Sequence, residues 1–150
     1  MSLPVSIVDS VALQLKASSS LLALLVGGIY SGRQAFSGQS TPRDVAGYLA
    51  PFVVVANAGE GALVGQLQTD YYRYFFNLYF YDDLERDYTT MIQAAQLART
   101  VLHLRNLPNA SEATTSASVC INQPGTMQGQ EMAFAANRLL VPYSITIQRR

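Results

Sequence analysis

The fold of this chain is decided by one aromatic stretch, YYRYFFNLYFY at residues 71–81. Successive side chains of a strand point to opposite faces, so the stretch divides into two sets. One set is entirely apolar or aromatic and consists of Tyr72, Tyr74, Phe76, Leu78 and Phe80. The other set includes the only strongly polar side chains and consists of Tyr71, Arg73, Phe75, Asn77, Tyr79 and Tyr81. This alternation predicts a long strand with one dry face against a core and one mixed face.

A helical pattern follows this strand directly. Between Leu84 and Leu102, apolar residues recur at spacings of three and four, which is the period of an amphipathic helix. Asp82, followed three residues later by Glu85, predicts a capping box at the helix start, and Pro108 prevents the helix from continuing. The strand and the helix together predict a sheet with a helix packed over it.

Two further helices are predicted before the aromatic strand. Residues 4–16 carry apolar side chains at helical spacing, and Pro4 lies in the first turn, where proline is tolerated. The serines at 18–20 predict the cap of a short second helix that carries the leucine run, and Gly27-Gly28 predicts its end. The leucine run is much shorter than the roughly 20 residues that span a bilayer, so no membrane segment is expected.

The other strands are predicted from β-branched or alternating runs. They are expected at residues 51–56, 62–69, 119–121 and 139–148, with a turn at 57–61 and a further short strand around 131–135. Within the last of the long runs, Pro142 predicts an edge position or a bulge, because proline cannot donate to a strand ladder.

This order of elements predicts an α+β fold. We expect a two-layer, mainly antiparallel sheet of four to six strands, with an N-terminal helix and one long helix packed on one face. A length of 150 residues suits one domain, residues 1–150. Long loops are predicted at residues 31–48 and 105–118, where small and polar residues predominate.

The composition favours a subunit that hides surface against neighbours. Charged residues make up 13% of the chain, about half the share of roughly 25% in ordinary globular domains. Ten basic residues balance ten acidic residues, so no nucleic-acid footprint is visible. The alternative is a compact monomer with a surface rich in Ser, Thr and Gln. No secretion signal is evident, which leaves the cytoplasm as the expected site of synthesis.

The sequence predicts no catalytic, cofactor-binding or metal-ligating residues. The chain has one histidine, His103, and one cysteine, Cys120, on different predicted elements, which does not favour a nucleophilic pair. A buried, inert thiol and a histidine that complements the helix dipole are the simpler interpretations. An acidic cluster at residues 82–87 is compatible with a hard-cation site, but helix capping explains the same carboxylates without an ion.

Aromatic residues on the mixed face of the strand indicate a contact surface, because exposed aromatics are enriched at interfaces. The expected subunit or partner interface on this face consists of Tyr71, Arg73, Phe75, Asn77, Tyr79 and Tyr81. The 31–48 loop adds Arg33, Phe36 and Arg43, because a loop of this length without catalytic groups is compatible with an arm that orders against a partner. A loop with no partner is the alternative.

The order and spacing of these elements from residue 4 to about 103 carry a family resemblance. The features are the N-terminal helix, the run ALLVGGIY at 23–30, the strand PFVVV at 51–55, the aromatic strand that ends in YDD at 81–83 and the helix MIQAAQLARTVL at 91–102. The closing strand at 139–148 fits as well. In these features the chain resembles the tail terminator, or tail-completion, proteins of long-tailed bacteriophages, although its 31–48 loop and its 105–137 segment are longer than usual in that family.

The resemblance implies a structural subunit of the virion tail or neck, made in the host cytoplasm. Such proteins form a homo-hexameric ring that caps the tail tube, stops its polymerisation and joins it to the head connector. The implied partners are further copies of the chain, the tail tube protein and the head connector or stopper protein. DNA passes through the lumen of such a ring without sequence-specific binding. The family has no enzymatic activity and no cofactor, and no membrane partner is implied.

Two other interpretations stay open. The first is another neck or connector subunit. The second belongs to a different class, because a helix and a curved sheet also form cone-shaped pockets that bind small apolar ligands. In that case the aromatic strand lines a cavity in place of a core. The absence of a polar dyad on the strands counts against a pocket of this kind, since Arg73 and Asn77 both lie on the mixed face.

Overall fold

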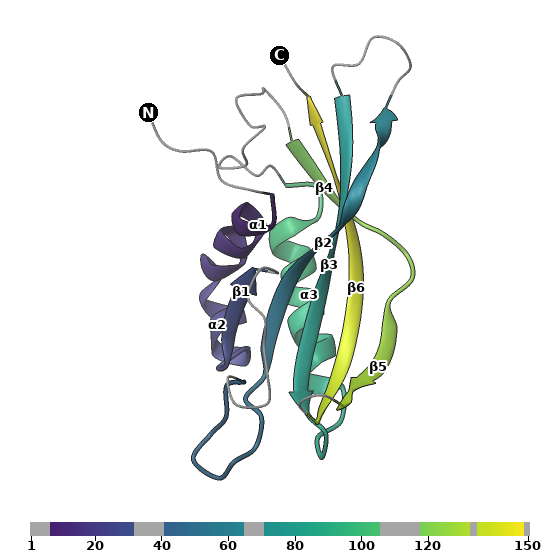
Figure 1. Ribbon diagram of the computed structural model, residues 1–150. Coiled ribbons are helices and arrows are strands. Elements are labelled where there is room, and N and C mark those ends of the chain that lie inside the picture. Colours follow the sequence, from purple (N-terminus) through teal and green to yellow (C-terminus); the bar gives the residue numbers. More distant parts are fainter. Residues whose placement is uncertain (1–6, 32–40, 65–70, 106–117, 133–134, 149–150) are drawn as a thin grey trace.

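The computed structural model describes residues 7–31, 41–64, 71–105, 118–132 and 135–148. Three helices and six strands follow one another along the chain (Figure 1). Their order is α1 (Ile7–Lys16), α2 (Ser19–Leu24), β1 (Gly28–Ser31), β2 (Phe52–Val64), β3 (Tyr71–Asp83), α3 (Thr89–Leu102), β4 (Ser118–Asn122), β5 (Met127–Glu131) and β6 (Ala136–Gln148).

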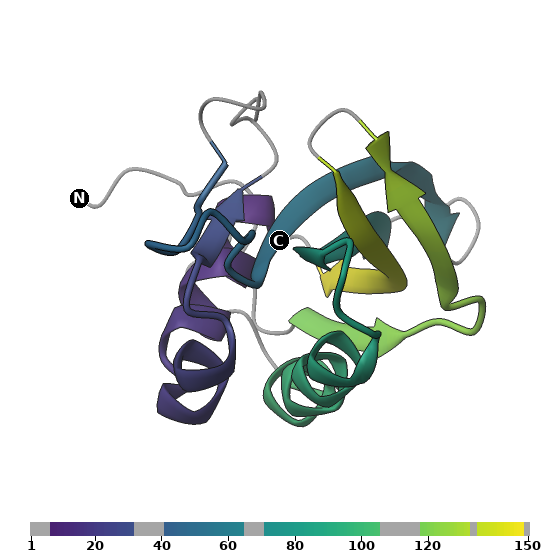
Figure 2. The ribbon, with the colours of Figure 1, turned by 90° about the horizontal axis from the view of Figure 1, so that it is seen from below.

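The strands form one six-stranded sheet in the order β1-β2-β3-β6-β4, and β5 also pairs with β6. Every pairing is antiparallel except that of β1 with β2. All three helices lie on one side of the curved sheet (Figure 2). The predicted α+β class, the mainly antiparallel sheet and the placement of the N-terminal and long helices on one face are confirmed.

The main core lies between this sheet and the helices. Phe76, Leu78 and Phe80 of β3 are at most 1% exposed and belong to the core, which confirms the dry face of the aromatic strand where its side chains are described. Tyr74 is half-buried against the same core. The helices contribute Val11, Leu15, Leu21, Met91, Ala94, Ala98 and Leu102, the residue after α2 contributes Leu25, and β6 contributes Leu139, Val141, Tyr143 and Ile145.

The turn predicted at residues 57–61 is wrong, because β2 runs through it without interruption. The strand pairs with β3 from Phe52 to Val64. Its register shifts twice, between Asn57 and Gly59 and again between Glu60 and Leu63. Such irregularities absorb extra residues in one strand while the pairing continues on either side. A glycine-rich segment opposite a long partner strand therefore forms bulges in place of a turn.

The predicted capping box is also wrong. The strand β3 continues through Asp83, and α3 begins only at Thr89. The carboxylate of Asp83 accepts hydrogen bonds from the N–H groups of Leu49 (2.9 Å) and Glu85 (3.0 Å). At the observed helix start, Asp87 Oδ1 accepts a hydrogen bond from the Thr89 N–H at 3.0 Å. The acidic residues thus organise the turn before the helix.

Two edge strands differ from expectation. Gly28–Ser31 forms β1, a parallel edge strand, where only the approach to a loop was expected. The short strand expected around 131–135 lies at Met127–Glu131 instead. Pro142 lies in β6 at the point where β5 has ended opposite Leu140 and β4 begins opposite Tyr143, so no outer strand requires its missing N–H.

The two N-terminal helices agree with their predicted signals. The Ser18 side chain accepts a hydrogen bond from the Leu21 N–H at 3.3 Å and caps α2. Gly28 follows with a φ of +108°, a conformation that glycine adopts without strain. None of the helices in the described ranges has the length and apolar character required to cross a membrane.

Candidate interaction surface

The sheet face opposite the helices is open over its middle part. On this face, Asn77 of β3 pairs with Pro142 of β6, and Tyr79 pairs with Leu140. Together with Phe75 of β3, these four residues form a surface that we call the open face. Phe75 is 36% exposed, and the other four are half-buried. The open face is mainly apolar and aromatic, and Asn77 contributes an amide side chain.

Polar contacts hold the aromatic side chains of this face in place. The Asn77 amide donates to the Tyr79 hydroxyl at 3.4 Å. The Arg138 guanidinium lies 5.8 Å from the centre of the Tyr79 ring and pairs with Glu131 at 3.7 Å. Such a cation over a ring face is attracted by the ring quadrupole. The open face is therefore an ordered surface in the isolated chain.

Tyr81 lies in a second, smaller core cluster at one end of this face. The cluster contains Leu49, Phe52, Val54, Tyr81 and Ala136. The Tyr81 ring stacks on Phe52 with a centroid distance of 5.0 Å, and Tyr81 is 9% exposed. Burial, with a contribution from Glu131, raises the pKa of Tyr81 to about 12. Of the six strand residues predicted for the interface, Tyr81 is thus covered by its own chain, while the side chains of Tyr71 and Arg73 lie outside the described part.

Residues 41–50 form a compact hairpin within the loop predicted at 31–48. Asp44 Oδ1 accepts hydrogen bonds from the N–H groups of Ala46 (2.9 Å) and Tyr48 (3.0 Å). The Arg43 guanidinium donates to the Gly47 carbonyl at 3.1 Å, so Arg43 stabilises the hairpin from within. Arg33 and Phe36 of the same predicted loop lie outside the described residues.

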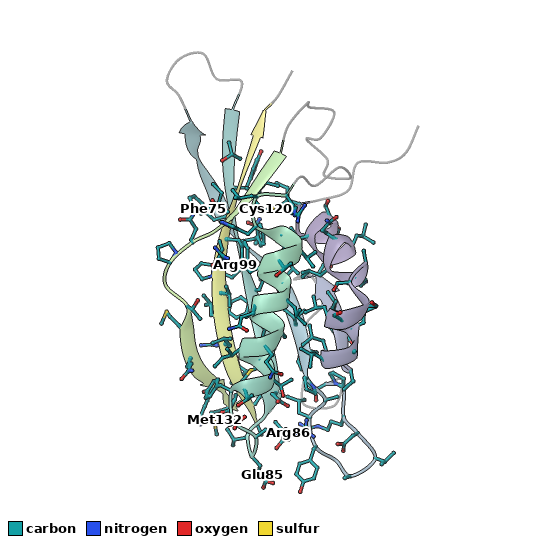
Figure 3. All side chains as sticks on the ribbon, turned by 180° about the vertical axis from the view of Figure 1, so that it is seen from behind. Phe75, Glu85, Arg86, Arg99, Cys120 and Met132 are labelled. Carbon is teal, nitrogen blue, oxygen red and sulfur yellow. The ribbon has the colours of Figure 1, made fainter. Side chains whose placement is uncertain are left out.

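This hairpin is anchored to the turn that follows β3. Leu49 is fully buried, and its N–H binds Asp83, while Asp44 pairs with Arg86 at 3.6 Å. Arg86 and Glu85 lie at the end of the molecule where the hairpin projects (Figure 3). Val45 at the tip of the hairpin is completely exposed. This hairpin was not predicted, although an Asp at position 44 followed by Gly47 is a local turn signal.

The acidic cluster at residues 82–87 stabilises the turn before α3, and its neighbouring aspartates Asp82 and Asp83 differ in their pKa shifts. Burial raises the pKa of Asp82, whose Oδ1 binds the Asp83 N–H (2.8 Å) and Arg86 (3.2 Å), while its Oδ2 has no partner within the described structure. Burial also opposes ionisation of Asp83, but the N–H groups of Leu49 and Glu85 outweigh it and lower the pKa of Asp83. No group of three or more potential metal ligands occurs among the described residues.

His103 and Cys120 lie side by side, and their contacts are structural. They form a parallel β-bridge at the end of α3, and His103 Nδ1 accepts a hydrogen bond from the Asn122 N–H at 3.0 Å. Cys120 is fully buried, and burial raises its pKa to about 12. A thiol with this pKa is protonated at neutral pH and is not a nucleophile.

Comparison with known proteins finds similarity at the level of fold. No family model matches the chain, and no curated protein matches it at a significant level. A solved chain from the virion of a native gene transfer agent particle superimposes with a TM-score of 0.66 and 15% identity, over 95% of both chains. A second solved structure matches with a TM-score of 0.50 and 14% identity, over 93% of this chain and 92% of the other. At these identities the shared property is the fold.

Proposed function

We propose that this chain is a structural subunit of a phage-like particle and acts there as a tail terminator. In this role it assembles into a homo-hexameric ring that caps the tail tube and joins it to the head connector. The observation that carries the proposal is the fold shared over 95% of the chain with a chain from a gene transfer agent virion. The order of helices and strands that resembles tail terminators supports the narrower role.

The surface of the subunit supports assembly. The chain is only 13% charged, and large apolar side chains remain exposed on several elements, including Val26, Phe75, Met127 and Met132. Apolar surface of this kind marks interfaces when it gathers into patches. The open face is the surface that we assign to contacts with neighbouring subunits, the tube protein or the connector, and the apex of the 41–50 hairpin is assigned to contacts with the tube protein or the connector. No catalytic group or cofactor is needed for such a role.

The small-ligand interpretation receives less support from the packing. It requires the aromatic strand to line a cavity. Instead, Phe76, Leu78 and Phe80 are at most 1% exposed and pack against helix residues in the main core. The face of the strand that is open, with Phe75 at its exposed end, is a surface. A contact surface therefore fits the strand better than a ligand cavity does.

The proposal is tested by native mass spectrometry and negative-stain microscopy of the purified chain, alone and with the tail tube protein of its own particle. We expect a hexameric ring and tubes of limited length that carry the ring at one end. A strict monomer at high concentration, with tube protein present, contradicts the proposal. A ring that binds the connector and leaves tube length unchanged assigns the chain to the neck and rejects the terminator role.

A further inference from the structure

An apolar groove runs along the side of α3 that faces away from α2. Its volume is about 210 Å³. Its walls are formed by apolar side chains of the helix and of the sheet, with Asn122 and Thr126 beside them. The apolar lining consists of Ile92 and Ala95 of α3 and Leu139, Val141 and Tyr143 of β6. Ile92 is 39% exposed although its side chain is aliphatic. The groove thus presents apolar surface that the described part of the chain does not cover.

A cation lines the same groove. Arg99 projects from α3 (Figure 3) and is exposed. Within the described residues its guanidinium forms neither an ion pair nor a hydrogen bond. Gln96, also on α3, adds a second polar side chain to the lining. The groove therefore fits an apolar segment that also carries free hydrogen-bond acceptors.

The opposite flank of the same molecule presents a segment of this chemistry. Leu22 of α2 is 42% exposed, and Val26 just beyond the helix is 69% exposed. Leu24 faces α3, because it lines a depression with Gln93 and Leu97. Two positions correspond to about 200° around a helix axis, so Leu22 points away from α3. Figure 2 shows α2 and α3 side by side, with the outer side of α2 facing away from the β5 edge of the sheet.

The α2 end also supplies acceptors. The Leu21 and Leu25 carbonyls already accept hydrogen bonds from the Leu25 and Gly28 N–H groups, and the other last carbonyls of α2 lie at the negative end of the helix dipole. They are suitable partners for the Arg99 guanidinium, while Leu22 and Val26 match the apolar walls at Ile92 and Ala95. Two different patches on opposite flanks are what a closed ring requires, since each copy then contacts the next in the same head-to-tail manner.

We propose that the α2 end of one copy, with Leu22 and Val26, docks into the α3–β6 groove of the next copy. This inference rests on the proposed ring and names its subunit contact. The partner is a second copy of the chain, because the complementary apolar segment and the groove occur on one molecule. The contact is heterologous, so neither patch meets itself.

Thiol crosslinking of the full chain tests the contact. The variant Val26→Cys and the variant Ile92→Cys are mixed and treated with a short bismaleimide. We expect covalent dimers in the mixture and none from either variant alone, and the double variant should give a ladder up to the full ring. Cys120 is buried with a pKa of about 12, so it does not compete. A mixture of Val45→Cys and Ile92→Cys is the control, since Val45 lies in the hairpin, outside both patches.

Blocking variants provide a second measurement. Ala95→Trp fills the groove, and Gln93→Trp places the same side chain on the other side of α3. We expect Ala95→Trp to raise the concentration for half-dissociation of the ring by about 30-fold, as for loss of a central contact, with little change for Gln93→Trp. Val26→Glu tests the other patch at an exposed site that folding does not require, and should weaken the ring similarly.

The outcomes separate this contact from the ring itself. A ring that forms without crosslinks between residues 26 and 92, and that tolerates both Ala95→Trp and Val26→Glu, rejects the contact and leaves the proposed function standing. Crosslinked dimers from Val26→Cys alone indicate a two-fold contact and also reject the head-to-tail arrangement. A chain that stays monomeric under all conditions rejects both the contact and the ring.

Discussion

At the residue scale, the neighbouring aspartates at the end of β3 make opposite contributions to stability. Asp82 is buried with one carboxylate oxygen unpartnered, and its pKa is raised. The folded state therefore binds its proton more tightly than the unfolded chain, and the resulting stability falls as pH rises through this window. Asp83 accepts hydrogen bonds from two N–H groups and has a lowered pKa. Its contribution is present above the unfolded pKa and is lost as pH falls.

The two amide variants should consequently show opposite pH dependence. Asp83→Asn removes the acceptor for one buried N–H, so we expect a loss of about 1–3 kcal/mol in the free energy of unfolding at pH 7, which shrinks toward pH 3. Asp82→Asn should gain stability relative to the parent chain as pH rises from 3 to 6. Urea unfolding at several pH values measures both. Parallel pH curves for the two variants would contradict this assignment.

The buried hydroxyl of Tyr143 is a second residue whose environment permits a prediction. Its oxygen has no hydrogen-bond partner within the described structure, and burial raises its pKa. Its ring stacks on Phe76 at 5.3 Å, a contact that phenylalanine retains. Tyr143→Phe should leave the free energy of unfolding unchanged or raise it by up to about 1 kcal/mol, since an unsatisfied polar group is removed. Thermal unfolding at fixed protein concentration measures this, and a clear loss would reveal a partner for the hydroxyl.

At the element scale, the predictions succeeded where one strong pattern acted alone. The alternation in β3 predicts the burial of Phe76, Leu78 and Phe80, because successive side chains of a strand point to opposite faces. The failures lie where local signals competed with tertiary pairing. Glycines at 59 and 61 are a turn signal, yet the long β3 opposite them offers partners to the backbone, and β2 continues. The carboxylates of Asp82 and Asp83 were assigned to the helix because the sequence does not show that the strand extends through them.

The residues predicted for the interface show the same division between local pattern and tertiary packing. Phe75 and Tyr79 follow from strand alternation alone, and both lie on the open face. The burial of Tyr81 could not be predicted, because Leu49, which belongs to the same cluster, comes from a hairpin about thirty positions earlier in the chain. The groove beside α3 likewise arises from packing between α3 and β6, two elements that are distant in sequence.

Asp44 is one of the side chains that order the 41–50 hairpin. Asp44 binds two N–H groups and pairs with Arg86. We expect Asp44→Ala to lower the free energy of unfolding by about 1–2 kcal/mol and to speed amide hydrogen exchange at residues 46–48. Hydrogen exchange by NMR measures the local effect. Val45→Ser at the exposed apex is the control and should change neither quantity, whereas equal exchange in both variants would show that Asp44 does not order the hairpin.

At the scale of the whole molecule, low charge and an ordered apolar surface both favour association. The chain has zero formal net charge and only 13% charged residues. Charge repulsion between copies therefore does little to keep them apart in solution. Several of the chain's exposed large apolar side chains lie on ordered elements, such as Phe75 on β3, Ile92 on α3 and Met127 on β5. A surface that is already ordered loses little conformational entropy when it associates.

Assembly through the open face gives the last prediction. Phe75 and Phe76 are adjacent in β3 but lie on opposite faces, with 36% and 1% exposure. Phe75→Asp should keep its circular dichroism and lose less stability than Phe76→Asp, because the Phe75 side chain reaches solvent, and it should lose the ring or its binding to the tube. Phe76→Asp should unfold the subunit, because it buries a carboxylate in the main core. If Phe75→Asp assembles normally by native mass spectrometry and still caps the tube, the open face has no role in the particle, and the groove beside α3 must account for assembly without it.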